Sequence, residues 1–423
     1  MTEHVQKTTL DNGVRVVTES LTHVASVAVG LWMAAGSRDE SPAQAGLAHF
    51  LEHMLFKGTE RRPSSKHIAD EMDNVGGYLN AFTDRELTCY HARALAEDLP
   101  LSIDLLTDMF RNSLFDPEET KRERKVVLEE LKRRDDDAED LIHDLFAEKL
   151  FPGHALGLPV IGSAETVSSF EPDDLRGFVT RHGGPQNLVL SATGNLEHAR
   201  VVELAQKALG DMKPTGPREK LPAPTPKPGR HLHSRPDEQA NFVVGVSGLT
   251  HFDDDRYAAA MLDVALGGSM GSRLFMEIRE KRGLAYSVGS YSQLYREGGY
   301  FAAYGGTSPE SLQECLELVY TELAKVRESG ILPEELHRAQ VQFRSALIMG
   351  QESMNSRMNR LGKAEIVYDR VASLSEIRAK IDAVTLEDVG RVAQSLLPES
   401  PEAMTTVAVG PFDDEHKSEE EAE

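Results

Sequence analysis

Three side chains suited to metal chemistry lie within five residues, in the segment His49-Phe50-Leu51-Glu52-His53. Residues four apart share one face of a helix, so His49 and His53 can both reach one metal ion. Glu52 lies beside the open coordination position, where its carboxylate can deprotonate a water that the metal has made acidic. Burying these polar groups in an otherwise apolar stretch is unfavourable unless a metal satisfies them. The pattern H-x-x-E-H therefore predicts a hydrolytic zinc site on a helix.

A catalytic zinc site needs a third protein ligand. The best candidates lie on a helix that we predict to begin with Asp116 as N-cap and Pro117 in its first turn. Glu123 and Glu130 are two turns apart on it, so one can bind the metal while the other supports a ligand. Spacing alone leaves Glu129 as a rival of Glu130. The alternative is an acid-rich helix that only presents charge to water.

Composition limits the class of protein. The chain has 423 residues, 40% of them hydrophobic, which is enough for two or more domains. No segment approaches the roughly 18 continuous apolar residues of a membrane span, and residues 1–7 resemble neither a signal nor a transit peptide, so we expect a cytoplasmic protein. The net charge of −23 argues against nucleic acid and membrane partners. Cys89 and Cys315 are expected to be free thiols.

The chain shows signs of an internal duplication. Residues 213–236 are rich in proline and predict a linker, whereas residues 413–423 predict a disordered acidic tail. The two flanking regions, residues 1–212 and 237–412, share short matching segments at an offset of 215 to 216 residues. The matched pairs are Val27–Gly30 with Phe242–Gly245, Phe115–Glu119 with Ile331–Glu335, and Val189–Gly194 with Thr405–Gly410.

Each copy is predicted to contain a strand, a helix, a hairpin, two helices, and a final strand and helix. This order indicates an α+β domain, with helices packed on one face of a mostly antiparallel sheet. At the positions of the three motif residues, the second copy has Ala265, Gly268 and Ser269. The second domain is therefore expected to keep the fold without metal ligands, which implies that the fold alone does not require the motif.

From Leu10 to Gly410 the sequence resembles the pitrilysin and insulin-degrading enzyme family of metallopeptidases, with an inverted zincin motif. Within that family it is similar to the short bacterial branch that resembles the β-subunit of mitochondrial processing peptidase. The segment Glu123–Glu130 matches the family's E-R-x-V-(I/V)-L-x-E pattern. The resemblance implies one Zn²⁺ per chain, held by His49, His53 and Glu130. It gives Glu123 a supporting role off the metal.

Two further segments resemble parts of the family's substrate site. Gly76–Thr83 is similar to its substrate-binding edge strand, which implies that Asn80, Ala81 and Phe82 contact an extended peptide. Ser272–Tyr286 is similar to its Arg/Tyr segment. There, Arg279 and Tyr286 would bind the substrate backbone and stabilise the oxyanion. Without the resemblance, we would expect a surface arginine and a half-buried strand tyrosine.

The resemblance implies a bacterial zinc-dependent endopeptidase that hydrolyses short or unfolded peptides inside an enclosed chamber. Because one chain carries all the elements and lacks the long glycine-rich loop of the non-catalytic partner subunits, a homodimer is expected. A heterodimer with an inactive homologue is the alternative assembly. Two other functions remain open: a maturation factor dedicated to one peptide, and a non-catalytic scaffold subunit of the same fold.

Overall fold

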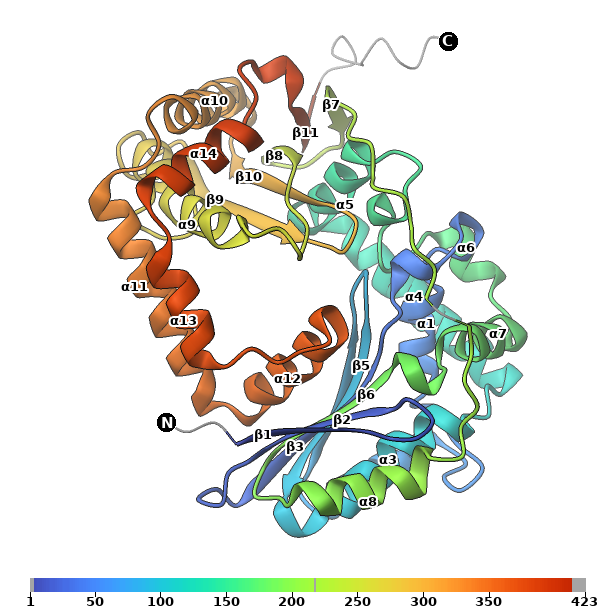
Figure 1. Ribbon diagram of the computed structural model, residues 1–423. Helices are drawn as coiled ribbons and strands as arrows, with labels where there is room; N and C mark the ends of the chain where they lie inside the picture. Colours follow the sequence, from blue (N-terminus) through green and yellow to red (C-terminus); the bar gives the residue numbers. More distant parts are fainter. Residues whose placement is uncertain (1–3, 217, 413–423) are drawn as a thin grey trace. The chain divides into compact units, whose positions relative to one another are not determined.

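The computed structural model describes residues 4–216 and 218–412 (Figure 1). They form two compact units, each built around one sheet. The first unit contains residues up to Leu131, Leu158–Lys220 and Leu347–Leu374, and the second contains Lys132–Gly157, Leu221–Ala346 and residues from Ser375 onward. The predicted acidic tail, residues 413–423, lies outside the described residues.

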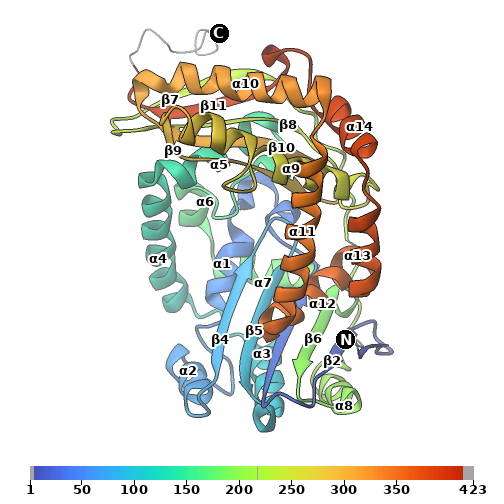
Figure 2. The same ribbon diagram turned by 90° about the vertical axis from the view of Figure 1, so that its left-hand side faces the viewer.

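The sheet of the first unit has β4 as one of its edge strands (Figure 2). Its strands follow the order β1 (Val5–Thr9), β2 (Arg15–Ser20), β6 (Leu188–Gly194), β3 (Ser26–Met33), β5 (Thr88–Leu95) and β4 (Tyr78–Thr83). Neighbouring strands are antiparallel except for β2 and β6, which are parallel. The prediction of a mostly antiparallel sheet is confirmed.

Both faces of this sheet are apolar. Along β3, Val29 and Leu31 join one hydrophobic cluster and Ala28 and Trp32 join another, because successive side chains of a strand point to opposite faces. Helices α1 (Leu47–Met54), α3 (Leu99–Asn112) and α8 (His198–Leu209) cover the first face, and α12 (Met354–Tyr368) covers the second (Figure 1). The expectation of helices on one face only is therefore corrected.

The second unit repeats this arrangement, although its described residues form no counterpart of β1. Its strands follow the order β7 (Gly229–Ser234), β11 (Thr405–Gly410), β8 (Ala240–Ser247), β10 (Gly299–Thr307) and β9 (Ala285–Leu294), with only β7 and β11 parallel. Helix α5 (Ala138–Leu150) packs on one face, and α9 (Arg256–Leu266), α10 (Leu312–Ser329) and α14 (Leu386–Leu396) lie on the other (Figure 2). The matched segments thus occupy equivalent strands: β3 corresponds to β8, and β6 to β11.

The units differ from the predicted contiguous domains. Helix α5 precedes the linker in sequence, yet its Phe146 packs with Val243 in the second unit. Helix α12 follows the linker, yet its Met358 packs in one cluster with Trp32 of the first. Each half of the sequence therefore supplies one helix to the unit built mainly from the other half. There the helix covers an apolar face of the sheet.

The predicted linker is shorter than residues 213–236. Residues Gly229–Ser234 of this segment form β7, which pairs with β11. Nearer its start, Arg218 donates to both carboxylate oxygens of Asp39 at 3.0 and 2.7 Å, which fixes this part on the first unit. Within the described residues, the segment without regular structure therefore ends before Gly229.

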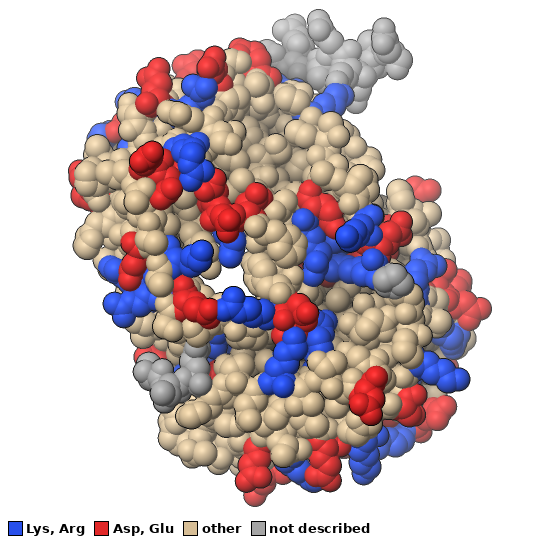
Figure 3. All heavy atoms as spheres, in the orientation of Figure 1, with Lys and Arg blue, Asp and Glu red and all other residues tan. Residues whose placement is uncertain are grey.

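The remaining helices of more than five residues are α2 (Ser65–Asp73), α4 (Pro117–Asp136), α6 (Ala164–Ser169), α7 (Pro172–His182), α11 (Pro333–Met349), α13 (Leu374–Ala383) and a π-helix at Phe275–Glu280. No helix within the described ranges has the length and apolarity to cross a bilayer. Lys and Arg side chains are interspersed with Asp and Glu on the face that Figure 3 shows. Cys89 and Cys315 are buried free thiols.

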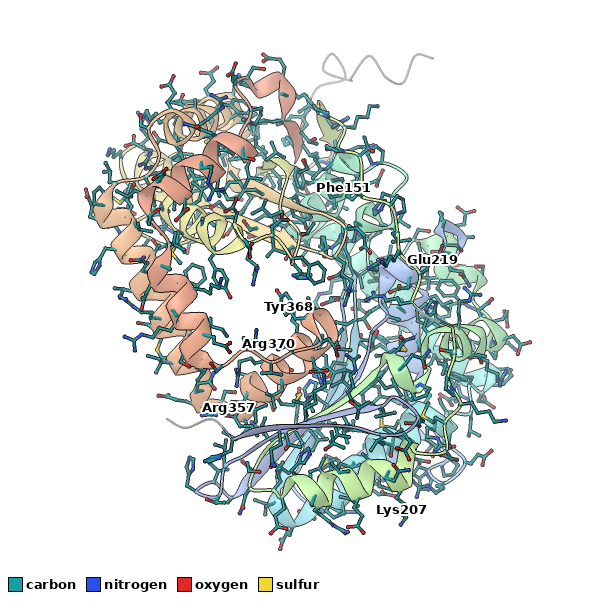
Figure 4. The ribbon with its side chains drawn as sticks, viewed as in Figure 1. Phe151, Lys207, Glu219, Arg357, Tyr368 and Arg370 are labelled. Atoms are coloured by element: carbon teal, nitrogen blue, oxygen red, sulfur yellow. The ribbon has the colours of Figure 1, made fainter. Side chains whose placement is uncertain are left out.

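Ion pairs anchor α12 to the first sheet. Arg357, near the start of the helix (Figure 4), donates to Glu19 on β2 at 2.5 Å, and the two side chains are only 9% and 1% exposed. Near the other end of α12, Glu365 lies 2.5 Å from Lys7 and 3.4 Å from Arg15. Charged pairs therefore fix the helix at both ends, while its apolar side chains fill the middle.

Replacing Arg357 with Met should strongly destabilise the first unit, because it leaves the Glu19 carboxylate buried without this cation. Removing one partner of a buried pair typically costs about 3–5 kcal/mol. Urea unfolding followed by the fluorescence of Trp32, the single tryptophan, measures this directly. Lys66→Ala, which removes the exposed pair Lys66–Asp70, is the control and should change little. Equal effects of the two variants would contradict this assignment.

Candidate metal centre

Helix α1 separates its apolar and polar residues cleanly. Its buried side is formed by Leu47, Ala48, Phe50, Leu51 and Met54. The three motif residues, His49, Glu52 and His53, are only partly buried and lie on the opposite side. The apolar side of α1 packs against the core, so the opposite side, which carries the three motif residues, points away from the core.

A buried carboxylate fixes the start of α1. Glu40 accepts hydrogen bonds from the N–H groups of Gly46 at 2.8 Å and Ala48 at 2.6 Å. Burial raises the pKa of Glu40 to about 8, although both hydrogen bonds act in the opposite direction. Gly46 itself has φ of 95° and lies against the backbone of Ile161, so another residue would be strained and would collide there. The sequence analysis missed Glu40 because its distance from the helix matches no capping pattern.

Helix α4 begins as predicted and carries the two expected carboxylates. Asp116 caps it by accepting from the N–H groups of Glu118 and Glu119 at 2.9 and 3.0 Å. Glu123 belongs to the buried stripe of the helix, whereas the side chain of Glu130 is 45% exposed. A carboxylate within a buried stripe needs a partner, and for Glu123 that partner comes from α1.

The structure brings His49, His53 and Glu130 together. Their donor atoms all lie within 4.8 Å of one another. Nε2 of His49 is 3.7 Å from Oε1 of Glu130, and Nε2 of His53 is 3.5 Å from its Oε2. Tetrahedral zinc with bonds of about 2.0–2.2 Å separates its ligand atoms by about 3.3–3.6 Å, which is close to both His–Glu130 distances, so this donor set suits the ion. The neighbouring carboxylate is that of Glu130 rather than Glu129.

Glu123 orients one of the imidazoles. Its Oε1 lies 2.9 Å from Nδ1 of His53, and its Oε2 lies 2.6 Å from Nζ of Lys57. Burial raises the pKa of Glu123, but His53 and Lys57 outweigh it and hold the pKa below its usual range. An ionised carboxylate only accepts, so Nδ1 of His53 carries a proton, and Nε2, which lies 3.5 Å from Glu130, is the nitrogen left for a metal ion. This is the usual support of a metal-binding histidine.

His49 is held in its neutral form. Burial and the neighbouring His53 lower its pKa to about 4. For His53, burial acts in the same direction, but the hydrogen bond and charge of Glu123 raise its pKa overall. Nδ1 of His49 is buried without a hydrogen-bond partner among the described residues. A neutral imidazole is the form that binds metal ions.

Glu52 lies between the cluster and the edge strand. Burial raises its pKa, whereas a hydrogen bond with Thr83 and the nearby His53 lower it, and Glu130 raises it further; the net shift is upward. Thr83 is the last residue of β4. The carboxylate of Glu52 is thus hydrogen-bonded to the strand that carries Asn80, Ala81 and Phe82.

Those three residues lie on an edge strand, as predicted. β4 pairs with β5 and ends the strand order of its sheet. The N–H of Ala81 donates to the side-chain oxygen of Asn80 at 2.8 Å, and the Asn80 amide donates to the Tyr78 hydroxyl at 2.6 Å. An edge strand exposes main-chain groups that can pair with a further strand. Their contact with a peptide stays a prediction.

Arg279 and Tyr286 form a second group, in the other unit. The Arg279 guanidinium lies 4.7 Å from the Tyr286 ring centre and 4.8 Å from that of Phe275, so it makes cation–π contacts with both rings. Tyr286 lies on the edge strand β9 and is 80% exposed, unlike the half-buried tyrosine expected without the resemblance. The predicted residues therefore form two groups, one in each unit.

Comparisons with known proteins also divide the chain into two parts. Residues 15–164 match the family model described as Insulinase (Peptidase family M16), and residues 169–343 match the one described as Peptidase M16 inactive domain. Within the described residues, only the first unit has a group of His, Cys, Asp or Glu donors close enough to hold a metal.

Similar proteins occur in several bacteria. A protein of Streptomyces coelicolor is 41% identical over 98% of this chain and 91% of its own, and one of Bacillus subtilis is 39% identical over 93% and 96%. Both are named as uncharacterized zinc proteases. A solved structure titled a protease from Helicobacter pylori has a TM-score of 0.88 at 23% identity, covering 97% of this chain and 100% of its own. That likeness shows the fold alone.

Replacing Glu130 with Ala should weaken zinc binding by more than about 100-fold, since even loss of a supporting partner costs about 10–100-fold. Competition with a chromogenic chelator measures the dissociation constant. Glu129→Ala, which removes the adjacent exposed carboxylate, is the matched control and should leave the constant unchanged. Similar weakening by both variants would refute the choice of Glu130.

Proposed function

Because the chain belongs to the insulinase family of peptidases (peptidase family M16), we propose that it is a zinc-dependent peptidase. The observation that carries this proposal is the meeting of His49, His53 and Glu130 at spacings that suit one zinc ion. The names of the related zinc proteases support the same metal and reaction.

The side chains around the site divide the work of hydrolysis. When bound, zinc would acidify a water and polarise the peptide carbonyl. Glu52 accepts the proton from the attacking water and returns it to the leaving amine. Its raised pKa suits both transfers, because burial weakens its preference for the ionised form. Glu123 keeps Nδ1 of His53 protonated and so fixes the direction of that ring.

The substrate is proposed to be a short or unfolded peptide in an extended conformation. Such a chain can add to β4 through main-chain hydrogen bonds, which are largely independent of sequence. Asn80, Ala81 and Phe82 lie on this strand. Arg279 and the exposed Tyr286 offer the guanidinium and hydroxyl donors that a substrate carbonyl and an oxyanion require. The homodimer, the enclosed chamber and the cytoplasmic location remain predictions.

Glu52→Gln tests the proposed reaction. The variant should bind zinc as tightly as the wild type, because Glu52 is not one of the three ligands. Its kcat on a quenched fluorescent peptide library should fall about 10²–10⁴-fold, the usual contribution of general acid–base catalysis. Zinc content and turnover are measured on the same samples. Full activity in the variant would exclude Glu52 as the proton carrier.

The wild-type result separates the other functions. Cleavage of many peptides supports a general peptidase. Cleavage of one precursor alone, against a flat background, would favour a dedicated maturation factor. Stoichiometric zinc without turnover on any peptide would contradict the proposal and favour a scaffold subunit.

Tyr286→Phe tests the second unit. Removing one oxyanion donor typically lowers kcat about 10²–10³-fold. Since the side chain is 80% exposed, the loss of its hydroxyl should not change the unfolding midpoint. Activity equal to the wild type, with unchanged zinc content, would remove Tyr286 from the proposed site.

A further inference from the structure

Trp32 connects three elements of the first unit. It is the single tryptophan of the chain, lies on β3 and is 1% exposed. Its indole N–H donates to the hydroxyl of Ser191 on β6 at 2.8 Å. That hydroxyl in turn donates to the main-chain oxygen of Met358 on α12 at 3.2 Å. The indole is therefore fixed in direction as well as buried.

Two glycines form the slot that holds the indole. A Cβ on Gly362 of α12 would lie 2.1 Å from Cε2 of Trp32. A Cβ on Gly30 of β3 would lie 2.6 Å from its Nε1 and 2.4 Å from the sulfur of Met358. Both distances are far below van der Waals contact, so any larger residue at either position must displace the ring.

Trp32 also contacts the predicted substrate strand. Its ring meets that of Phe82 at a centroid distance of 5.6 Å and an interplanar angle of 80°, an edge-to-face contact. Phe82 lies on β4, which has β5 as its only strand neighbour in the sheet. Because β4 forms main-chain hydrogen bonds with a neighbouring strand on one side only, its position depends strongly on the packing of its side chains.

We propose that Trp32 is a positioning residue for substrate binding: seated in the slot of α12, it supports Phe82 and thereby aligns β4 for pairing with a peptide. This role rests on the proposed function. It is distinct from the metal centre, because α1 packs on the opposite face of the sheet, with the other hydrophobic cluster.

Steady-state kinetics on the quenched peptides separates this role from simple core packing. Gly362→Ala and Trp32→Leu should raise KM about tenfold, the scale of one misaligned hydrogen bond. The change in kcat should be smaller, since it arises only through the bond between Thr83 and Glu52, and zinc content should stay unchanged. Trp32→Phe, which keeps an aromatic edge against Phe82, should recover most of the KM. Val17→Ala removes volume from the same cluster on β2 and should lower stability without changing KM.

Trp32 also provides a readout that needs no core substitution. Adding a tryptophan-free, fluorescein-labelled casein peptide to Glu52→Gln protein should shift the tryptophan emission, with the same saturation curve as the anisotropy of the peptide. Binding without an emission change, or an unchanged KM in Gly362→Ala, overturns the role of Trp32 alone. If no peptide binds and none is cleaved, the proposed function itself fails, and the positioning role with it.

Discussion

A sheet that is apolar on both faces has to be covered on both faces, and this constraint determines the architecture of the first unit. Alternate side chains of β3 enter two separate clusters. The first face is covered by α1, whose remaining side then presents the motif residues. The second is covered by α12, which the sequence supplies from beyond the Pro-rich segment. The metal cluster and the support of β4 are thus consequences of the same requirement.

Partial burial gives the cluster its chemistry. Fully exposed imidazoles and carboxylates would titrate near their ordinary values, and fully buried ones would be unreachable. Here burial keeps His49 neutral, while the ionised Glu123 outweighs burial at His53 and orients that ring. The two imidazoles of one short helix therefore have pKa values shifted in opposite directions, and the carboxylate that raises the pKa of His53 also fixes the direction of its ring.

Sequence reasoning reached features that depend on local spacing. The common face of His49 and His53, the Asp116 cap and the duplicated strands all follow from short periods and matching segments. Glu130 required the family resemblance, because a partner on a distant helix leaves no local signal. Glu40, the slot for Trp32 and the exchange of α5 and α12 were missed for the same reason. Each depends on which surfaces, far apart in the sequence, pack together in the fold. Neither secondary-structure propensity nor hydrophobic periodicity predicts such packing.

The duplicated unit shows which part of the site belongs to the fold and which was added. In the second unit, α9 also reaches its sheet through a carboxylate, since Asp263 accepts from the Ser290 hydroxyl at 2.5 Å. That carboxylate is satisfied within the unit, and burial raises its pKa to about 6. In the first unit, the polar residues of α1 point away from the core and towards α4 and the edge strand. Among the described residues, the same framework therefore brings together donors that can hold a metal only where its helix presents polar groups that the fold itself does not satisfy.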